Sequence, residues 1–185
     1  MRCVITILLL VSSTFSYAQY LSGNWQNHLQ NHIVDFQSCN SSNEENAKCF
    51  QQIGKALHSL YKMNDFYSRD KNRYMTVSEI NDYLENNTQW KLLGKGYDQA
   101  VLEQAQNLAN KKRAVIAIYL NEERLGQLAY ILPGDMTASG SWGLKVPNSG
   151  AFNASAPEKS YKDKGLSYSF PRRLITNVQI YTRDI

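Results

Sequence analysis

The chain has 185 residues, 43% of them hydrophobic and 19% charged, and its formal net charge at pH 7 is +4. This length is sufficient for one domain with a hydrophobic core of its own. Because the charge is small and no cluster of basic and aromatic residues occurs, we expect no nucleic-acid partner.

The N-terminal residues MRCVITILLLVSSTFSYAQY have the pattern of a secretory signal peptide. Arg2 precedes an apolar run over 4–10, and small residues follow up to Ala18. The run is too short to span a bilayer, and no later stretch is apolar enough to be a transmembrane helix. We therefore expect a signal peptide at 1–18, a single domain at 19–185, and a secreted or periplasmic protein without membrane association.

Four segments have the hydrophobic periodicity of amphipathic helices. One of them opens with a capping box, in which Thr76 is followed three residues later by Glu79. Asp98 is a suitable N-cap for the last of the four. The predicted helices are 24–36, about 46–62, a segment that begins at Thr76, and 98–112.

The periodicity changes after residue 112. RAVIAIYL (113–120) and GQLAYILP (126–133) predict two strands joined by a polar turn. Helices followed by antiparallel strands indicate an α+β fold. Shorter strands are predicted at 141–147, 166–170 and 177–183, and 148–165 is expected to be a long irregular loop over a groove.

Two cysteines remain once the predicted signal peptide, which contains Cys3, is removed. Cys39 and Cys49 would lie in an oxidising compartment, where they either form a disulfide or leave one of them as a nucleophile. Cys49 lies near the start of a predicted helix and follows Lys48, and both features favour a thiolate. The two alternatives stay open from the cysteine pattern alone.

The order of motifs from residue 47 onward resembles the secreted papain-fold peptidoglycan amidases of the CHAP and NlpC type. In that family a cysteine at a helix start is followed by a small-residue helix, a Val-Ile-Ala strand, a Gly-His-Val strand and a Pro-Gly turn. The matching segments are AKCFQQIGKALHSLYKMNDFY, MTVSEINDYLENNTQWKLLG, AQNLANKKRAVIAIYL, GQLAYILPG, SGSWGLKVPNSG and KGLSYSF. The resemblance implies a papain-like fold with Cys49 at the nucleophile position, Gln127 at the histidine position and Asn148 as an orienting residue.

The chain departs from this family where its chemistry lies. Phe50 follows the cysteine where asparagine is usual, and Gln127 replaces the histidine. A glutamine amide cannot shuttle a proton at neutral pH, so the proton-transfer contribution of about 10²–10⁴ would be lost. The histidines, at 28, 32 and 58, all precede residue 60. We therefore expect catalysis to be impaired.

The resemblance also implies a binding groove. Trp142, Tyr130 and Asn148 would border it, with the two aromatic rings offering flat faces to sugar or peptide. For Trp142 the alternative is a core side chain at a tight turn, and for Gln127 it is an ordinary polar residue at a strand start. His28 and His32, four residues apart on one helix, are too few to predict a metal site.

Three functions are compatible with these observations. The first is a peptidoglycan-directed amidase-like domain with impaired catalysis, which binds peptidoglycan or its peptide stems. The second is a non-catalytic protein-binding module, such as an inhibitor or immunity-type partner of a cell-wall amidase, which would use residues 148–165 and the Trp142 turn. The third is a disulfide-closed structural domain. None of them requires a cofactor or a metal.

Overall fold

The computed structural model describes residues 21–38, 46–124, 126–153 and 156–184. The predicted signal peptide at 1–18 and Cys39 lie outside these residues. The described part contains both helices and antiparallel sheets, so the predicted α+β class is confirmed.

The four predicted helices are present close to their expected bounds. They are α1 (Trp25–Gln37), α2 (Asn46–Tyr61), α3 (Val77–Asn86) and α4 (Gln99–Asn110). The capping box at the start of α3 forms as predicted, and the Asp98 side chain accepts a hydrogen bond from the Ala100 backbone at 2.9 Å. Within the described ranges, no helix combines the length and hydrophobicity that crossing a bilayer needs.

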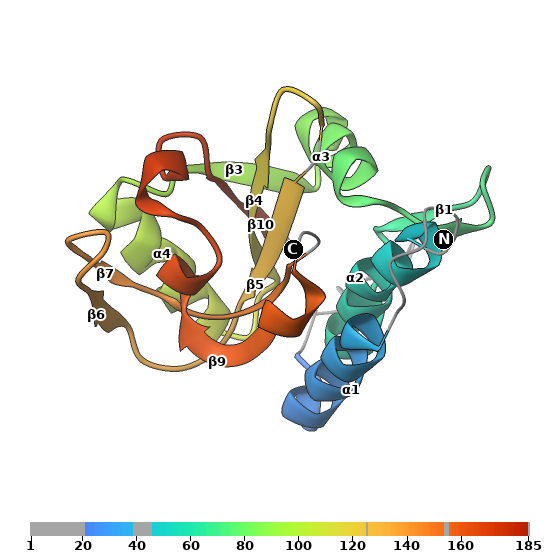
Figure 1. Cartoon of the computed structure of the whole chain (residues 1–185), viewed down its shortest axis with the longest axis horizontal. Coiled ribbons are helices and arrows are strands. Elements are labelled where there is room, and N and C mark those ends of the chain that lie inside the picture. The colour runs from blue at the N-terminus through green and yellow to red at the C-terminus, as the bar shows by residue number, and fades with distance from the viewer. Residues whose placement is uncertain (1–20, 39–45, 125, 154–155, 185) are drawn as a thin grey trace, which may run out of the picture.

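A six-stranded antiparallel sheet forms the centre of the molecule (Figure 1), in the order β3-β10-β4-β5-β8-β9. Its two long central strands, β4 and β5, are those predicted from the apolar segments before and after the polar turn. The strands are β3 (Trp90–Lys95), β10 (Gln179–Arg183), β4 (Val115–Leu120), β5 (Gly126–Ile131), β8 (Asn148–Phe152) and β9 (Tyr161–Gly165).

Alternate residues of β4 and β5 face two separate hydrophobic layers, because successive side chains of a strand point to opposite faces. On one face, Leu128 and Tyr130 pack with residues of α1, α2 and α3. On the other face, Ala129 and Ile131 pack with α4. Figure 1 shows α1 and α2 on one side of the sheet and α4 on the other.

Short elements connect these layers. Among the described residues, two small antiparallel hairpins lie outside the main sheet, and three turns of 3-10 helix follow residue 156. The hairpins are β1 (Tyr67–Ser68) with β2 (Arg73–Tyr74) and β6 (Thr137–Ser139) with β7 (Leu144–Val146); the turns are η1 (Pro157–Lys159), η2 (Leu166–Tyr168) and η3 (Arg172–Leu174).

The prediction of a long irregular loop at 148–165 is wrong, because this segment supplies β8 and β9 of the main sheet. Its small residues are required by packing and do not indicate irregular backbone. A Cβ atom at Gly150 would lie 2.7 Å from Cδ2 of Leu29 in α1, so a side chain at residue 150 would force Leu29 to shift.

The predicted strand at 166–170 is also wrong, because residues 166–168 form the η2 turn. Leu166 and Phe170 are both buried, and a spacing of four brings two side chains to one side of a helical turn. Conversely, β3 was not predicted. Its burial pattern does not alternate, with Leu92 51% exposed, and it is a strand because it pairs with β10.

The Tyr130 hydroxyl joins the sheet to α2, donating a hydrogen bond of 2.6 Å to the carbonyl of Ile53. Replacing Tyr130 with Phe would remove the donor from a fully buried position. We expect Tyr130→Phe to lower the free energy of unfolding by about 1 kcal/mol in urea denaturation. Tyr97→Phe is the matched control at a side chain that is 54% exposed, and equal stability of the two variants would contradict this role.

Candidate functional site

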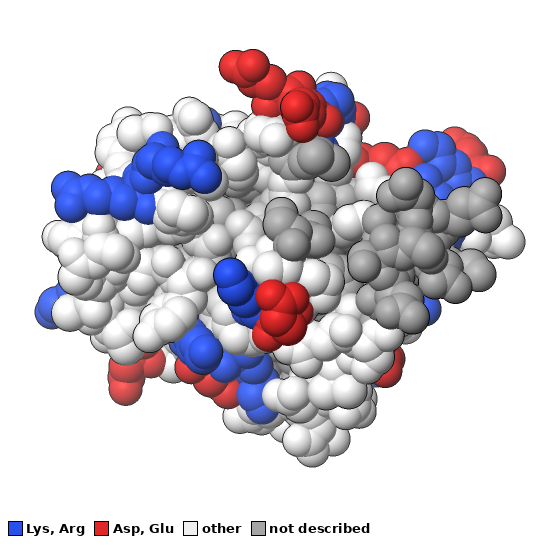
Figure 2. Space-filling view, in the orientation of Figure 1, with Lys and Arg blue, Asp and Glu red and all other residues white. Residues whose placement is uncertain are grey.

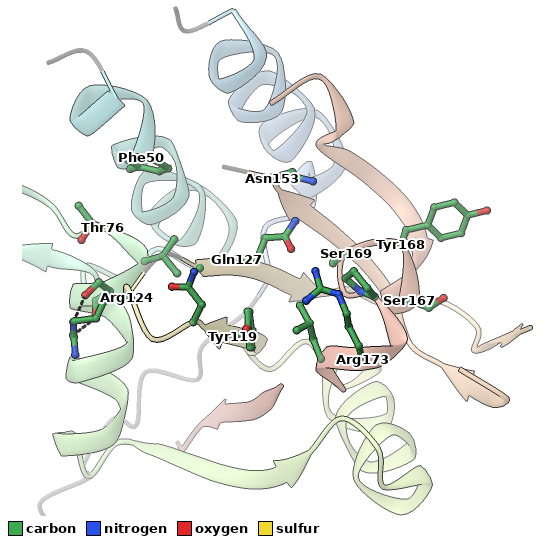
Figure 3. A pocket seen from close by; sticks show the side chains of 16 residues that line it. Phe50, Thr76, Tyr119, Arg124, Gln127, Asn153, Ser167, Tyr168, Ser169 and Arg173 are labelled. Carbon is green, nitrogen blue, oxygen red and sulfur yellow. Dashed lines mark hydrogen bonds between the residues drawn. The ribbon is translucent and has the colours of Figure 1, made fainter. Parts of the chain in front are cut away.

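A cavity of about 960 Å³ opens where α2 begins, β5 begins and the η2–η3 segment passes. Figure 3 shows this pocket with Gln127 between Arg124 on one side and Arg173 on the other. Its lining is Phe50, Thr76, Val77, Ser78, Tyr119, Asn121, Arg124, Gly126, Gln127, Asn153, Ser167, Tyr168, Ser169, Pro171, Arg173 and Leu174.

Cross-strand pairing places three of the polar side chains in the pocket wall. Tyr119 lies directly opposite Gln127 in the β4–β5 ladder. In the β5–β8 ladder Leu128 pairs with Phe152, so continuing the antiparallel register brings Asn153 beside Gln127. The start of β5 and the end of β8 therefore supply adjacent amides.

The Gln127 side chain is half-buried and forms no hydrogen bond with any described residue. Its amide can both donate and accept, as a peptide group does. Asn153 is oriented by its own turn, because its Oδ1 accepts a hydrogen bond of 3.1 Å from the Ala156 backbone. The side-chain amides in the pocket therefore match the hydrogen-bond donors and acceptors of the uncharged backbone of a bound peptide.

The two arginines of the lining have different environments. Arg124 forms hydrogen bonds of 2.6 Å with both carboxylate oxygens of Asp82, and its Nε donates to Ser78. Asp82 therefore compensates the Arg124 charge. Arg173 is exposed, and no described residue forms a hydrogen bond or ion pair with its side chain. No acidic residue belongs to the described lining, so the pocket carries positive charge.

The rim at Thr76 is fixed by the α3 capping box. The Thr76 hydroxyl accepts a hydrogen bond from the Glu79 backbone, and the Glu79 carboxylate accepts one of 2.8 Å from the Thr76 backbone. Arg73 binds both oxygens of this carboxylate at 2.8 and 2.9 Å, and Lys71 forms a further ion pair with it. The hydrogen bonds from Arg73, followed by those from Lys71 and Thr76, hold the pKa of Glu79 well below its ordinary value.

Cys49 does not lie in the wall of this pocket. Its side chain is 6% exposed, packs in the α2 layer of the core, and is disulfide-bonded. A disulfide-bonded sulfur is not a nucleophile. Gln127, in contrast, alternates with Leu128 and so shares a strand face with Ala129, on the α4 side. The structure therefore does not join Cys49 and Gln127 into one reactive pair. The Cys39–Cys49 pairing stays a prediction, since Cys39 lies outside the described residues.

The two aromatic residues expected to border a groove are core side chains. Tyr130 is fully buried and bonded to Ile53, and Trp142 is 3% exposed with its Nε1 donating to the carbonyl of Phe170 at 2.9 Å. Neither lines the pocket. The expectation of flat binding faces at these positions is corrected, because a core position and a binding face produce the same pattern in sequence.

Asn148 lies at the opposite end of the β5–β8 ladder from Gln127 and cannot orient it. Its backbone bonds to the Gln106 side chain, and its Nδ2 donates to the carbonyl of Pro133 at 3.0 Å. Asn148 thus holds the Pro133-Gly134 turn. The amide beside Gln127 is that of Asn153, and only the strand register reveals it.

Tyr168 and Ser169 were missed because they lie in the segment that was predicted to be a strand, and Arg173 was missed because no element was predicted between residues 170 and 177. Tyr168 is 70% exposed at the pocket rim, and Ser169 is buried with a 2.7 Å hydrogen bond to the Tyr161 hydroxyl. A non-repetitive segment has no period that assigns its side chains to a face. The only signal in the sequence is the pair of arginines after Pro171.

No histidine is among the described residues that line the pocket. Both ring nitrogens of His32 are within hydrogen-bonding distance of partners on α2, Gln52 at 2.9 Å and Ser59 at 2.8 Å. Burial lowers the pKa of His32. In the part of the chain that the structure covers, no three potential metal ligands come together.

No protein-family model matches the chain, and no characterised protein matches it significantly in sequence.

The disulfide at Cys49 predicts how this residue responds to thiol-alkylating reagents. Protein isolated from an oxidising compartment should not be alkylated by iodoacetamide at Cys49, even when it is unfolded in guanidinium, because the sulfur is oxidised. Reductant together with denaturant should expose it. Mass spectrometry of tryptic peptides measures the modification, and labelling in denaturant without reductant would show a free, merely buried thiol.

The lowered pKa of Glu79 predicts that its contribution to the free energy of unfolding depends on pH. Since its folded-state pKa lies below its ordinary value of 4.5, the contribution is present above pH 4.5 and is lost as the pH falls toward the folded-state pKa. The difference in unfolding free energy between wild type and Glu79→Gln should therefore shrink from pH 7 to pH 3. Glu122→Gln, in the exposed β4–β5 turn, is the control, and a difference that grows on acidification would refute the assignment.

Proposed function

We propose that this protein is a secreted, papain-like relative of the peptidoglycan amidases whose pocket binds peptidoglycan stem peptides without cleaving them. The observation that carries the proposal is the chemistry of the pocket wall. Its described residues include no histidine, no carboxylate and no free thiol, while the half-buried Gln127 lines the wall without a hydrogen bond to any described residue.

Amide cleavage requires groups that this wall lacks. A cysteine amidase needs a thiolate and a base that returns the proton to the leaving amine. Cys49 is oxidised and buried, and Gln127 has no useful basicity near neutral pH. Binding, in contrast, needs only placed donors and acceptors, which the pocket has in its amides and hydroxyls.

The arrangement of elements supports relationship to the amidase scaffold. In the papain-like arrangement, the helix that begins with the cysteine packs on an antiparallel sheet and its start meets the strand of the base. Here α2 packs on the sheet through Tyr130 and Ile53, and Phe50 shares the pocket with Gln127. The protein-binding alternative depended on a loop at 148–165 and on an accessible Trp142. Most of that segment belongs to β8, η1 and β9, and Trp142 is buried.

Two measurements on purified peptidoglycan test the proposal. Wild-type protein should co-sediment with the sacculi and release no muropeptides by liquid chromatography. Gln127→Leu, which removes the amide and keeps the approximate size, should weaken co-sedimentation about fivefold, as expected for one hydrogen bond of about 1 kcal/mol. The control is Gln104→Leu, an exposed position on α4.

Each component of the proposal can fail separately. Muropeptide release by wild type would show that the protein is an active enzyme. Absence of co-sedimentation would show that peptidoglycan is not its ligand. Gln127→His should remain inactive without reductant, because a base alone does not restore the oxidised Cys49.

A further inference from the structure

The pocket has a charge imbalance that its amides do not explain. Two of its lining residues are cations and none of the described ones is an anion. Asp82 binds Arg124 through both carboxylate oxygens, so that charge is compensated within the protein. The remaining positive charge is that of Arg173.

Arg173 is held at the pocket by a rigid turn. It belongs to η3, where the Leu174 backbone bonds to the Pro171 carbonyl at 2.9 Å and Val178 bonds to that of Leu174 at 3.1 Å. The buried Ile175 fixes this segment to the core. Figure 3 shows the Arg173 side chain extending from η3 on the side of the pocket that carries Ser167, Tyr168 and Ser169.

The surroundings of Arg173 add to its positive field. Lys164 lies over the Tyr168 ring, with its Nζ 5.2 Å from the ring centroid. Arg172 is the next residue in the chain and is also exposed, but its guanidinium is directed to the Ser141 carbonyl and it does not line the pocket. Figure 2 shows basic side chains on this part of the surface. The acidic residues Glu122 and Glu123 lie in the β4–β5 turn, which borders the pocket through Asn121 and Arg124 but contributes neither carboxylate to the described lining.

A guanidinium group recognises a carboxylate through two parallel hydrogen bonds, with a geometry that lysine cannot reproduce. The neighbouring amides of Gln127 and Asn153 match the donors and acceptors of a peptide backbone. We infer that the pocket selects peptides that carry a free carboxylate, with Arg173 as the anchor for that group and Gln127 as a contact to the adjacent peptide bond. This inference rests on the proposed function and specifies its ligand.

The carboxylate has two possible sources in a stem peptide, the C-terminus and the α-carboxylate of the γ-linked D-Glu. Suitable probes are the tetrapeptide L-Ala-γ-D-Glu-L-Lys-D-Ala with both carboxylates free, and the same peptide amidated at either one or both positions. Isothermal titration calorimetry at 50 mM salt gives the dissociation constants. Wild type should bind the doubly amidated peptide about tenfold more weakly than the free acid, and the singly amidated peptides show which carboxylate is read.

Variants at two adjacent arginines separate specific recognition from overall charge. Arg173→Gln should weaken binding of the free acid about tenfold and leave the doubly amidated peptide unaffected, and Arg173→Lys should recover only part of the loss. Arg172→Gln makes the same change in net charge and should have no such effect. Raising the salt concentration should reduce the difference between the acid and the amide, since the charge of the exposed Arg173 is screened by ions.

The outcomes separate the two proposals. Equal affinity for the acid and the amide, or equal effects of Arg172→Gln and Arg173→Gln, would overturn the carboxylate anchor while leaving a peptide-binding pocket. Gln127→Leu could abolish binding of both the free acid and the doubly amidated peptide while Arg173→Gln leaves the preference for the acid unchanged. That result would show that another residue binds the carboxylate. If wild type binds none of the peptides and does not co-sediment with sacculi, the proposed function fails and the inference fails with it.

Discussion

The packing of α2 on the central sheet determines the position of the pocket. The contact is apolar except for the Tyr130 hydroxyl, which bonds to the Ile53 carbonyl inside the helix. A buried hydroxyl without an acceptor would be costly, so this bond fixes how far α2 can slide along β5. Phe50 lies one turn before Ile53, so this contact places the start of α2 at the cavity, which Gln127 lines from the α4 face of β5.

The burial and oxidation of Cys49, which exclude thiolate chemistry at this residue, also stabilise the domain. A thiolate needs access to solvent or to a cationic partner, whereas Cys49 lies in the core and is oxidised. The cavity is formed by elements that do not depend on it: the β4–β5 ladder, the end of β8 and the η2–η3 turns. The shape of the pocket therefore does not depend on the chemical state of Cys49.

Much of the architecture follows from local sequence signals. The four helices were predicted from periodicity, and the capping box at Thr76 and the cap at Asp98 formed because their hydrogen bonds involve near neighbours in the chain. The central strands β4 and β5 were evident from their apolar runs. The sequence thus predicted those elements that are determined by contacts between residues close together in the chain.

The remaining parts depend on contacts between distant segments. Strand β8 is rich in small residues because Leu29 of α1 occupies the space above Gly150, and nothing near residue 150 records that helix. Asn153 joins Gln127 only through the β5–β8 register, and Arg173 comes from a turn without periodicity. Trp142 and Tyr130 show the converse case, since a large aromatic residue has the same appearance in sequence whether it lies in the core or at a ligand.

The position of β10 has a consequence for biosynthesis. This strand, at residues 179–183, lies between β3 and β4 in the interior of the sheet, although β3 precedes it by more than eighty residues. The sheet therefore cannot close while the chain is still emerging, and the backbone groups of β3 and β4 that later bind β10 stay open to other strands. Such a topology folds late, because the pairing that completes the sheet joins segments distant in the chain and waits for the last strand.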